Sequence, residues 1–137
     1  MPLIQRQKAS GGGMIPEDVL CAFDVAQSQL EWRGDVRLAL LVADAPGHGY
    51  GLPGVADEFP DGCAPDQPTP LADVARRLAH ERGVDLIMTR LGKARPCPTK
   101  LMEDALRDIY DTIGTRRGFG AIAMPTSADA FKVRTWI

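Results

Sequence analysis

The residues with the clearest potential for chemistry are Asp44 and His48. Asp44 directly follows an apolar run, and His48 comes shortly after it. A carboxylate can hold a hard cation such as Mg²⁺, and an imidazole can act as an acid, a base or a metal ligand. Ligand sites in open α/β sheets lie beyond the carboxyl ends of the strands, so an acid that follows a strand is well placed. The alternative is that Asp44 only caps a turn that Pro46 and Gly47 shape.

One enzymatic interpretation is a metal-dependent or hydrolytic enzyme that uses Asp44 and His48. Such an enzyme needs a cleft that joins these two residues to further acids, such as Asp57 or Asp61. The sequence contains no G-x-S-x-G motif, which would mark a serine nucleophile. The second histidine, His80, lies in a predicted helix beside charged residues, so we expect it to face solvent.

A GTPase is a second interpretation, because the string Asp44–His48 resembles the D-x-x-G motif that faces magnesium in translational GTPases. Those proteins also need a GxxxxGK[ST] loop that surrounds the phosphates of the nucleotide. The sequence contains no such loop. We therefore do not expect nucleotide hydrolysis.

Composition narrows the possible partners and compartments. The 137 residues carry 16 basic and 18 acidic side chains, a balance that favours neither nucleic acid nor an acidic membrane surface as a partner. The three cysteines form no CxxC pair, so the sequence predicts neither a zinc knuckle nor a thioredoxin-like site. The longest apolar run, Leu38–Ala43, is far shorter than the ~20 residues of a membrane-spanning helix. With no export signal at the start of the chain, we expect a cytoplasmic protein.

Apolar periodicity predicts alternating helices and strands. Pro and acidic residues at 16–18 are typical of a helix start, and Gly83 is typical of a position just after a helix. The run Leu38–Val42 is apolar without alternation, which predicts a strand that is covered on both faces. The predicted helices are Pro16–Trp32, Leu71–Arg82 and Lys100–Ile113. The predicted strands are Val36–Ala43, Val84–Thr89, Ala121–Met124 and Phe131–Ile137, with a strand end near Pro2–Ala9.

This order predicts an α/β fold, namely a Rossmann-like, doubly wound and mostly parallel sheet with helices on both faces. We expect one domain over residues 1–137, with a long Gly- and Pro-rich loop at 45–70. So few strands make a thin sheet. The sequence therefore predicts that this chain is the later part of a larger domain and lacks the first strand or strands of that domain.

Several short strings, taken in order, resemble the von Willebrand factor A-like domains of alpha-kinase-associated proteins. The resemblance covers roughly Ser10 to Ile113. It implies a doubly wound α/β fold, a ligand-binding role and often a metal-ion-dependent adhesion site, whose oxygen ligands suit a divalent cation. The strings are Ser10–Gly13, Pro16–Val19, Trp32, Ala43–Gly49, Asp57–Gly62 and Gly83–Leu86.

The sequence departs from this family at the expected metal site. The D-x-S-x-S element of the adhesion site is absent, and Met14 stands where the family tends to have an acid. Only Asp44 matches a metal position, and Gly47 replaces the usual cysteine of the family. The kinase that accompanies some members has no counterpart in this chain. The resemblance therefore implies a degenerate site with no bound metal, or at most a weakly bound Mg²⁺ at Asp44.

These observations predict a protein-binding module without catalytic activity of its own. We expect its binding surface to include Asp44, His48 and Asp18, with Gly12 and Gly13 of the glycine run. Two alternatives remain open. One is the enzyme that uses Asp44 and His48. The other is a degenerate fragment whose sheet is completed only by another chain.

Overall fold

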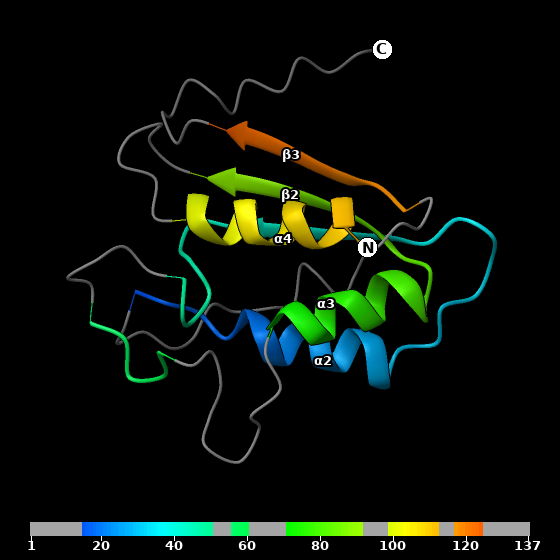
Figure 1. Cartoon of the computed structure of the whole chain (residues 1–137), viewed down its shortest axis with the longest axis horizontal. Helices are drawn as coiled ribbons and strands as arrows, with labels where there is room; N and C mark the ends of the chain where they lie inside the picture. The colour runs from blue at the N-terminus through cyan, green and yellow to red at the C-terminus, as the bar shows by residue number, and fades with distance from the viewer. Residues whose placement is uncertain (1–14, 51–55, 61–70, 92–98, 113–116, 125–137) are drawn as a thin grey trace, which may run out of the picture.

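The computed structural model describes residues 15–50, 56–60, 71–91, 99–112 and 117–124. Within these ranges, helices and strands alternate along the chain (Figure 1). The predicted strands at Pro2–Ala9 and Phe131–Ile137 lie outside the described residues, as do parts of the 45–70 loop. In chain order the elements are α2 (Val19–Ser28), β1 (Leu38–Ala43), α3 (Leu71–His80), β2 (Asp85–Leu91), α4 (Lys100–Thr112) and β3 (Phe119–Met124).

The three strands form one parallel sheet in the order β1-β2-β3. Leu38 of β1 pairs with Asp85 of β2, and Leu86 of β2 pairs with Phe119 of β3. The three strands therefore begin at nearly the same level of the sheet. Each pair of neighbouring strands is connected through a helix, as parallel strands require. The predicted α/β class with a parallel sheet is therefore confirmed.

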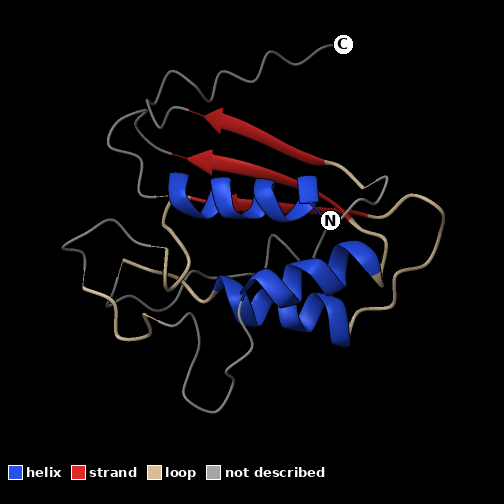
Figure 2. Cartoon of the chain, viewed as in Figure 1, coloured by secondary structure: helices blue, strands red, loops and turns tan. Residues whose placement is uncertain are grey.

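All three described helices pack on one face of this sheet (Figures 1 and 2). On this face Phe23 of α2 and Leu78 of α3 belong to one core cluster with Leu86 of β2, and Leu41 of β1 packs against that cluster. From α4, Tyr110 contacts Phe119 of β3, with ring centroids 6.0 Å apart. The sequence predicted helices on both faces. The strand order explains the difference, because right-handed crossovers that always step in one direction leave their helices on the same side.

The core lies between this sheet face and the helices. Its centre consists of aliphatic and thioether side chains that are almost fully buried. At ~1.5–3 kcal/mol for each large apolar side chain removed from water, this layer is the main force that holds helices and sheet together. Its innermost members are Val74, Leu78, Val84, Leu86, Met88, Met102 and Leu106.

The helix starts and ends follow the local sequence. Asp18 caps α2, because its carboxylate oxygen accepts a hydrogen bond of 3.1 Å from the amide of Cys21. In α3 the buried residues Leu71, Val74 and Leu78 recur at helical spacing. Gly83 follows α3 with a positive φ of 64°, as predicted for a residue just past a helix end.

The opposite face of the sheet carries no described helix. Along β1 the side chains alternate, so that Leu38, Leu40 and Val42 are exposed while Ala43 is buried. The sequence predicted burial on both faces from the unbroken apolar run, and this prediction was wrong for the described part of the chain. No described helix is long and apolar enough to cross a membrane.

Candidate functional site

A short backbone bridge joins the start of α2 to the segment that follows β1. The amide of Glu17 donates to the carbonyl of Pro46 at 2.8 Å, and the amide of His48 donates to the carbonyl of Glu17 at 3.1 Å. These bonds form a parallel bridge between Glu17 and Gly47. The bridge places Asp18 next to the 44–48 segment, so the structure brings together three of the five residues predicted for the binding surface. Gly12 and Gly13 lie outside the described residues.

Gly47 is the tightest point of this bridge. A Cβ at this position would lie 3.1 Å from the sulfur of Met102 and 3.1 Å from Cβ of Val19. The amide of Gly47 also donates to the sulfur of Met102 at 3.2 Å. This packing favours glycine at position 47, because a larger residue would push the bridge away from α4 and α2.

His48 and Asp57 form a close pair at the surface of the bridge. Nδ1 of His48 lies 2.7 Å from a carboxylate oxygen of Asp57, and the two side chains are only 10% and 12% exposed. The ring of His48 also packs edge-on against Phe59, with centroids 5.1 Å apart. The sequence had named Asp57 only as one possible further acid beside His48, and the structure brings these two residues into contact.

Asp57 has three hydrogen-bonding partners. These bonds hold the segment around His48 and Gly49 against the segment around Phe59. The amides of Gly49 and Phe59 donate to its two oxygens at 2.8 and 2.9 Å. Burial by itself would raise the pKa of Asp57. The hydrogen bonds from Gly49, His48 and Phe59 outweigh burial, and they lower the pKa below its ordinary value.

The pair leaves one nitrogen of the imidazole open. The hydrogen bond of the His48 side chain in the described part of the chain uses Nδ1, and Nε2 takes no part in it. When Nδ1 carries the proton that Asp57 accepts, Nε2 presents a lone pair. An oriented neutral imidazole of this kind can accept a proton or hold a metal ion.

Asp44 lies at the carboxyl end of β1, as the sequence predicted, and it is exposed. Among the described residues it makes no hydrogen bond or ion pair. Within the described segments 15–18, 44–50 and 56–60, we define the acidic edge as the exposed acids Glu17, Asp18, Asp44 and Glu58. These segments contain no lysine or arginine. Apart from His48, the ionisable side chains that these three segments carry are therefore acidic or neutral.

Metal ligands do not gather here in the described part of the chain. No group of three or more histidine, cysteine, aspartate or glutamate side chains is placed to hold a metal ion among the described residues. Asp44 alone offers one carboxylate, whereas Mg²⁺ takes near-octahedral oxygen coordination. The described donor set does not fit a resident divalent cation.

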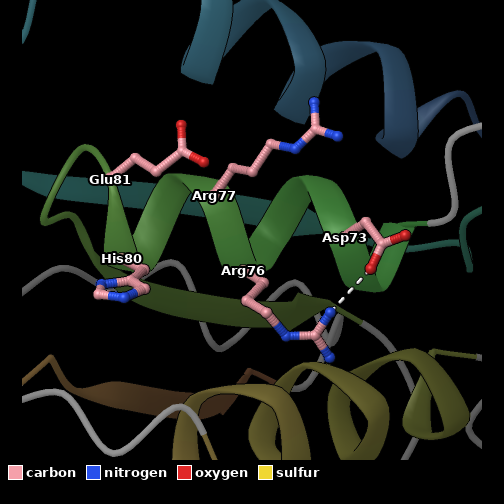
Figure 3. Close-up of a pocket in the computed structure, with 5 residues that line it drawn as sticks. All are labelled: Asp73, Arg76, Arg77, His80 and Glu81. Carbon is pink, nitrogen blue, oxygen red and sulfur yellow. Dashed lines mark hydrogen bonds and ion pairs between the residues drawn. The ribbon is translucent and has the colours of Figure 1, made fainter.

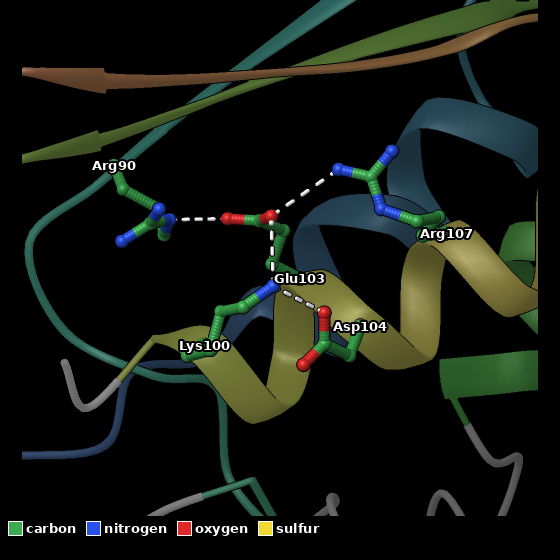
Figure 4. Close-up of polar contacts among 5 residues, drawn as sticks. All are labelled: Arg90, Lys100, Glu103, Asp104 and Arg107. Atoms are coloured by element: carbon green, nitrogen blue, oxygen red, sulfur yellow. Dashed lines mark hydrogen bonds and ion pairs between the residues drawn. The ribbon is translucent and has the colours of Figure 1, made fainter.

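A second polar cluster, which the sequence reasoning missed, lies between β2 and α4 (Figure 4). Glu103 is buried, with a side chain only 4% exposed, and it pairs with Arg90. Lys100 and Arg107 approach its other oxygen at 3.2 and 3.3 Å. Burial alone would raise the pKa of Glu103, but the bonds from Lys100, Arg90 and Arg107 lower it. The available signal was the spacing of Lys100, Glu103 and Arg107, which places all three on one helical face.

The exposed side of α3 carries a shallow depression of about 200 Å³ (Figure 3). Its one described ion pair joins Arg76 to Asp73 at 2.7 Å. Both residues are half exposed, so this pair contributes little to stability. The predicted exposure of His80 is confirmed. The depression is lined by Asp73, Arg76, Arg77, His80 and Glu81.

Comparison with known protein families, with characterised proteins and with solved structures finds no match to this chain.

Proposed function

We propose that the chain is a protein-binding module of Rossmann-like fold that resembles a von Willebrand factor A domain. It has no catalytic activity of its own, and its metal-ion-dependent adhesion site is degenerate. The proposal for the metal site depends on the sequence, which has Asp44 but no D-x-S-x-S element. The partner is a protein that binds at the carboxyl edge of the sheet.

The acidic edge is the observation that carries this proposal. Its four exposed acids stand on segments that contain no lysine or arginine among the described residues. Such a surface attracts a partner with a basic patch and repels acidic ones. The partner therefore presents lysine or arginine side chains to Glu17, Asp18 and Asp44.

The fixed backbone around the acidic edge also supports the proposal of a binding surface. The bridge at Glu17 and Gly47, together with the three bonds to Asp57, holds the acids on a framework of fixed backbone. A surface that is already ordered loses less conformational entropy when a partner binds. The carboxyl edge is also where open α/β sheets generally bind their ligands.

A charge-reversal experiment tests the proposal. The wild-type chain and a Glu17→Lys/Asp44→Lys variant are used as baits in the cells from which the chain comes, and the recovered proteins are quantified. The control is Asp108→Lys, which reverses an exposed acid on α4. We expect the variant to lose a basic partner that wild type and control both retain. Equal recovery by all three baits contradicts binding at the acidic edge.

The pair of His48 and Asp57 favours a second function, a metal-dependent or hydrolytic enzyme that uses His48 and Asp44. An imidazole held by a carboxylate is the arrangement of general bases and of metal ligands with an outer carboxylate. In this case Nε2 would bind the metal or remove a proton from the attacking nucleophile.

Calorimetric titration with Mg²⁺, Mn²⁺ and Ca²⁺ separates the two functions. Saturable binding that is lost in Asp44→Ala would support the enzyme and would argue against a degenerate site. Any hydrolytic activity found must also fall in His48→Gln. Activity that survives in both variants would eliminate the enzymatic proposal.

A further inference from the structure

The open face of the sheet presents a continuous apolar surface. Leu38, Leu40 and Val42 of β1 are 51%, 62% and 54% exposed, and Ile122 of β3 is 50% exposed. In a parallel register, paired residues share a face, so Val42 and Ile122 lie on either side of Thr89 on this surface. Parallel sheets are normally covered on both faces, which makes this exposure unusual.

The apolar surface continues around the edge of β1. A groove of about 140 Å³ lies between α2 and β1, and Leu40 contributes to its wall. Beyond the amino end of the strand, Val36 is also highly exposed. Together these side chains form a patch on the order of 500 Å², at the upper end of what monomeric proteins expose.

The chemistry of the patch limits what can cover it. The one charged residue among the described members of this face is Asp85, at the amino end. One of its oxygens accepts a hydrogen bond of 2.7 Å from the amide of Gly118, and the other lies 3.9 Å from Arg117. The rest of the described face has aliphatic, thioether, glycine or threonine side chains. Such a surface gives no charge attraction to a charged partner and no repulsion against an identical face.

The area is in the range that a symmetric dimer needs. A stable interface buries ~800 Å² on each partner, and the interfaces of homodimers are the most apolar class. The patch, on the order of 500 Å², supplies more than half of that area. Two such sheets can pack face to face ~10 Å apart and share one apolar layer.

We infer that the open sheet face binds a second copy of this chain. The contact is isologous, with the same patch on both subunits related by a two-fold axis. Leu40 and Ile122 of one copy pack against the open face of the other. Asp44 follows Val42 by two residues at the carboxyl end of β1, so the dimer contact borders the acidic edge.

The test is the oligomeric state of the full chain by sedimentation equilibrium across the micromolar range. Leu40→Glu places a charge at the centre of the patch. Leu101→Glu is the matched control, because Leu101 is exposed to a similar degree, 48%, but lies on α4. We expect wild type and Leu101→Glu to dimerise and Leu40→Glu to dimerise at least about tenfold more weakly.

The thermal midpoint gives an independent readout. Because dimerisation stabilises the folded state by mass action, the Tm of wild type should rise with chain concentration, and that of Leu40→Glu should not. If Leu40→Glu fails to fold, Leu40→Thr/Val42→Thr keeps a strand-compatible surface and is expected to give the same weakening. A wild-type chain that stays monomeric, or a dimer that is insensitive to both patch variants, overturns the inference. Loss of a partner at the acidic edge has no bearing on this result.

Discussion

Replacement of Glu103 by alanine should strongly destabilise the fold. Glu103 lies on the buried face of α4, and its carboxylate balances Arg90 of β2, which is itself mostly buried. Removal of one partner leaves the other charge in a site of low polarity, which is far less favourable than the loss of an exposed ion pair. The expected loss of stability therefore comes mainly from breaking the ion pair of Glu103 and Arg90.

The structure gives the magnitude. The loss of one partner of a buried ion pair lowers stability by ~3–5 kcal/mol. Lys100 and Arg107 are about half exposed, so their contacts with Glu103 add little. Because Arg90 keeps some contact with solvent, we expect a loss of about 2–4 kcal/mol for Glu103→Ala. Glu103→Gln keeps one acceptor oxygen and should lose roughly half as much.

Urea unfolding followed by circular dichroism, at one fixed chain concentration, measures this loss as a lower midpoint. Asp104→Ala is the control, because Asp104 is the next residue on α4 and makes only a half-exposed pair with Lys100. The control should change stability by less than about 0.5 kcal/mol. If Glu103→Ala loses no more than Asp104→Ala, the cluster does not stabilise the fold and the reasoning is wrong.

The pH dependence of this effect has a defined sign. The pKa of Glu103 is lower in the folded chain than its ordinary value, which is close to 4.5. The carboxylate therefore stabilises the fold at pH values above its unfolded pKa, and that contribution disappears as the pH falls through the lower folded pKa. The stability difference between wild type and Glu103→Gln should therefore be constant near neutral pH and should shrink in acid.

Three further predictions concern the bridge and the core. Asp57→Asn should speed amide exchange at Gly49 and Phe59, and since the folded pKa of Asp57 is lowered, wild type should show the same loosening only in acid; unchanged exchange in the variant argues against its ordering role. Gly47→Ala should lower the urea midpoint by the equivalent of about 1–3 kcal/mol, because its methyl group would crowd Met102, and an unchanged midpoint would show that the bridge can shift. Burial raises the pKa of Tyr110, so ultraviolet titration should show one tyrosine that stays neutral well above pH ~10 until the chain unfolds, and that is missing in Tyr110→Phe.

Local sequence signals were sufficient for the described helices and strands. In α3, Leu71, Val74 and Leu78 recur at the spacing of an amphipathic helix. In α2, Asp18 provides a cap at the helix start, where the helix dipole favours an acid. The arrangement of helices around the sheet was harder to predict. An unbroken apolar run such as Leu38–Ala43 is the same whether a second layer covers it or a second molecule does. The run indicated burial on both faces, yet Leu38, Leu40 and Val42 are exposed, so the pattern alone does not show whether a second layer is present.

The site was predictable only in part. Asp44 was located from its place after a strand, a rule of topology that holds for parallel sheets in general. The contact of His48 with Asp57 depends on how the chain returns after Tyr50, and no local pattern encodes that return. The cluster around Glu103 needed Arg90 from another element, so its buried charge could not be recognised from the helix alone. Both the pair of His48 with Asp57 and the cluster around Glu103 therefore depend on contacts between different segments of the chain.

The most direct test of the proposed function is site-specific photo-crosslinking in the cells from which the chain comes. A photoreactive residue placed at position 44 sits on the acidic edge, and the same residue at position 108 sits on the exposed side of α4. We predict a discrete cross-linked partner from position 44 and none from position 108. Cross-linking from position 108 alone, or from neither position, would contradict binding at the carboxyl edge of the sheet.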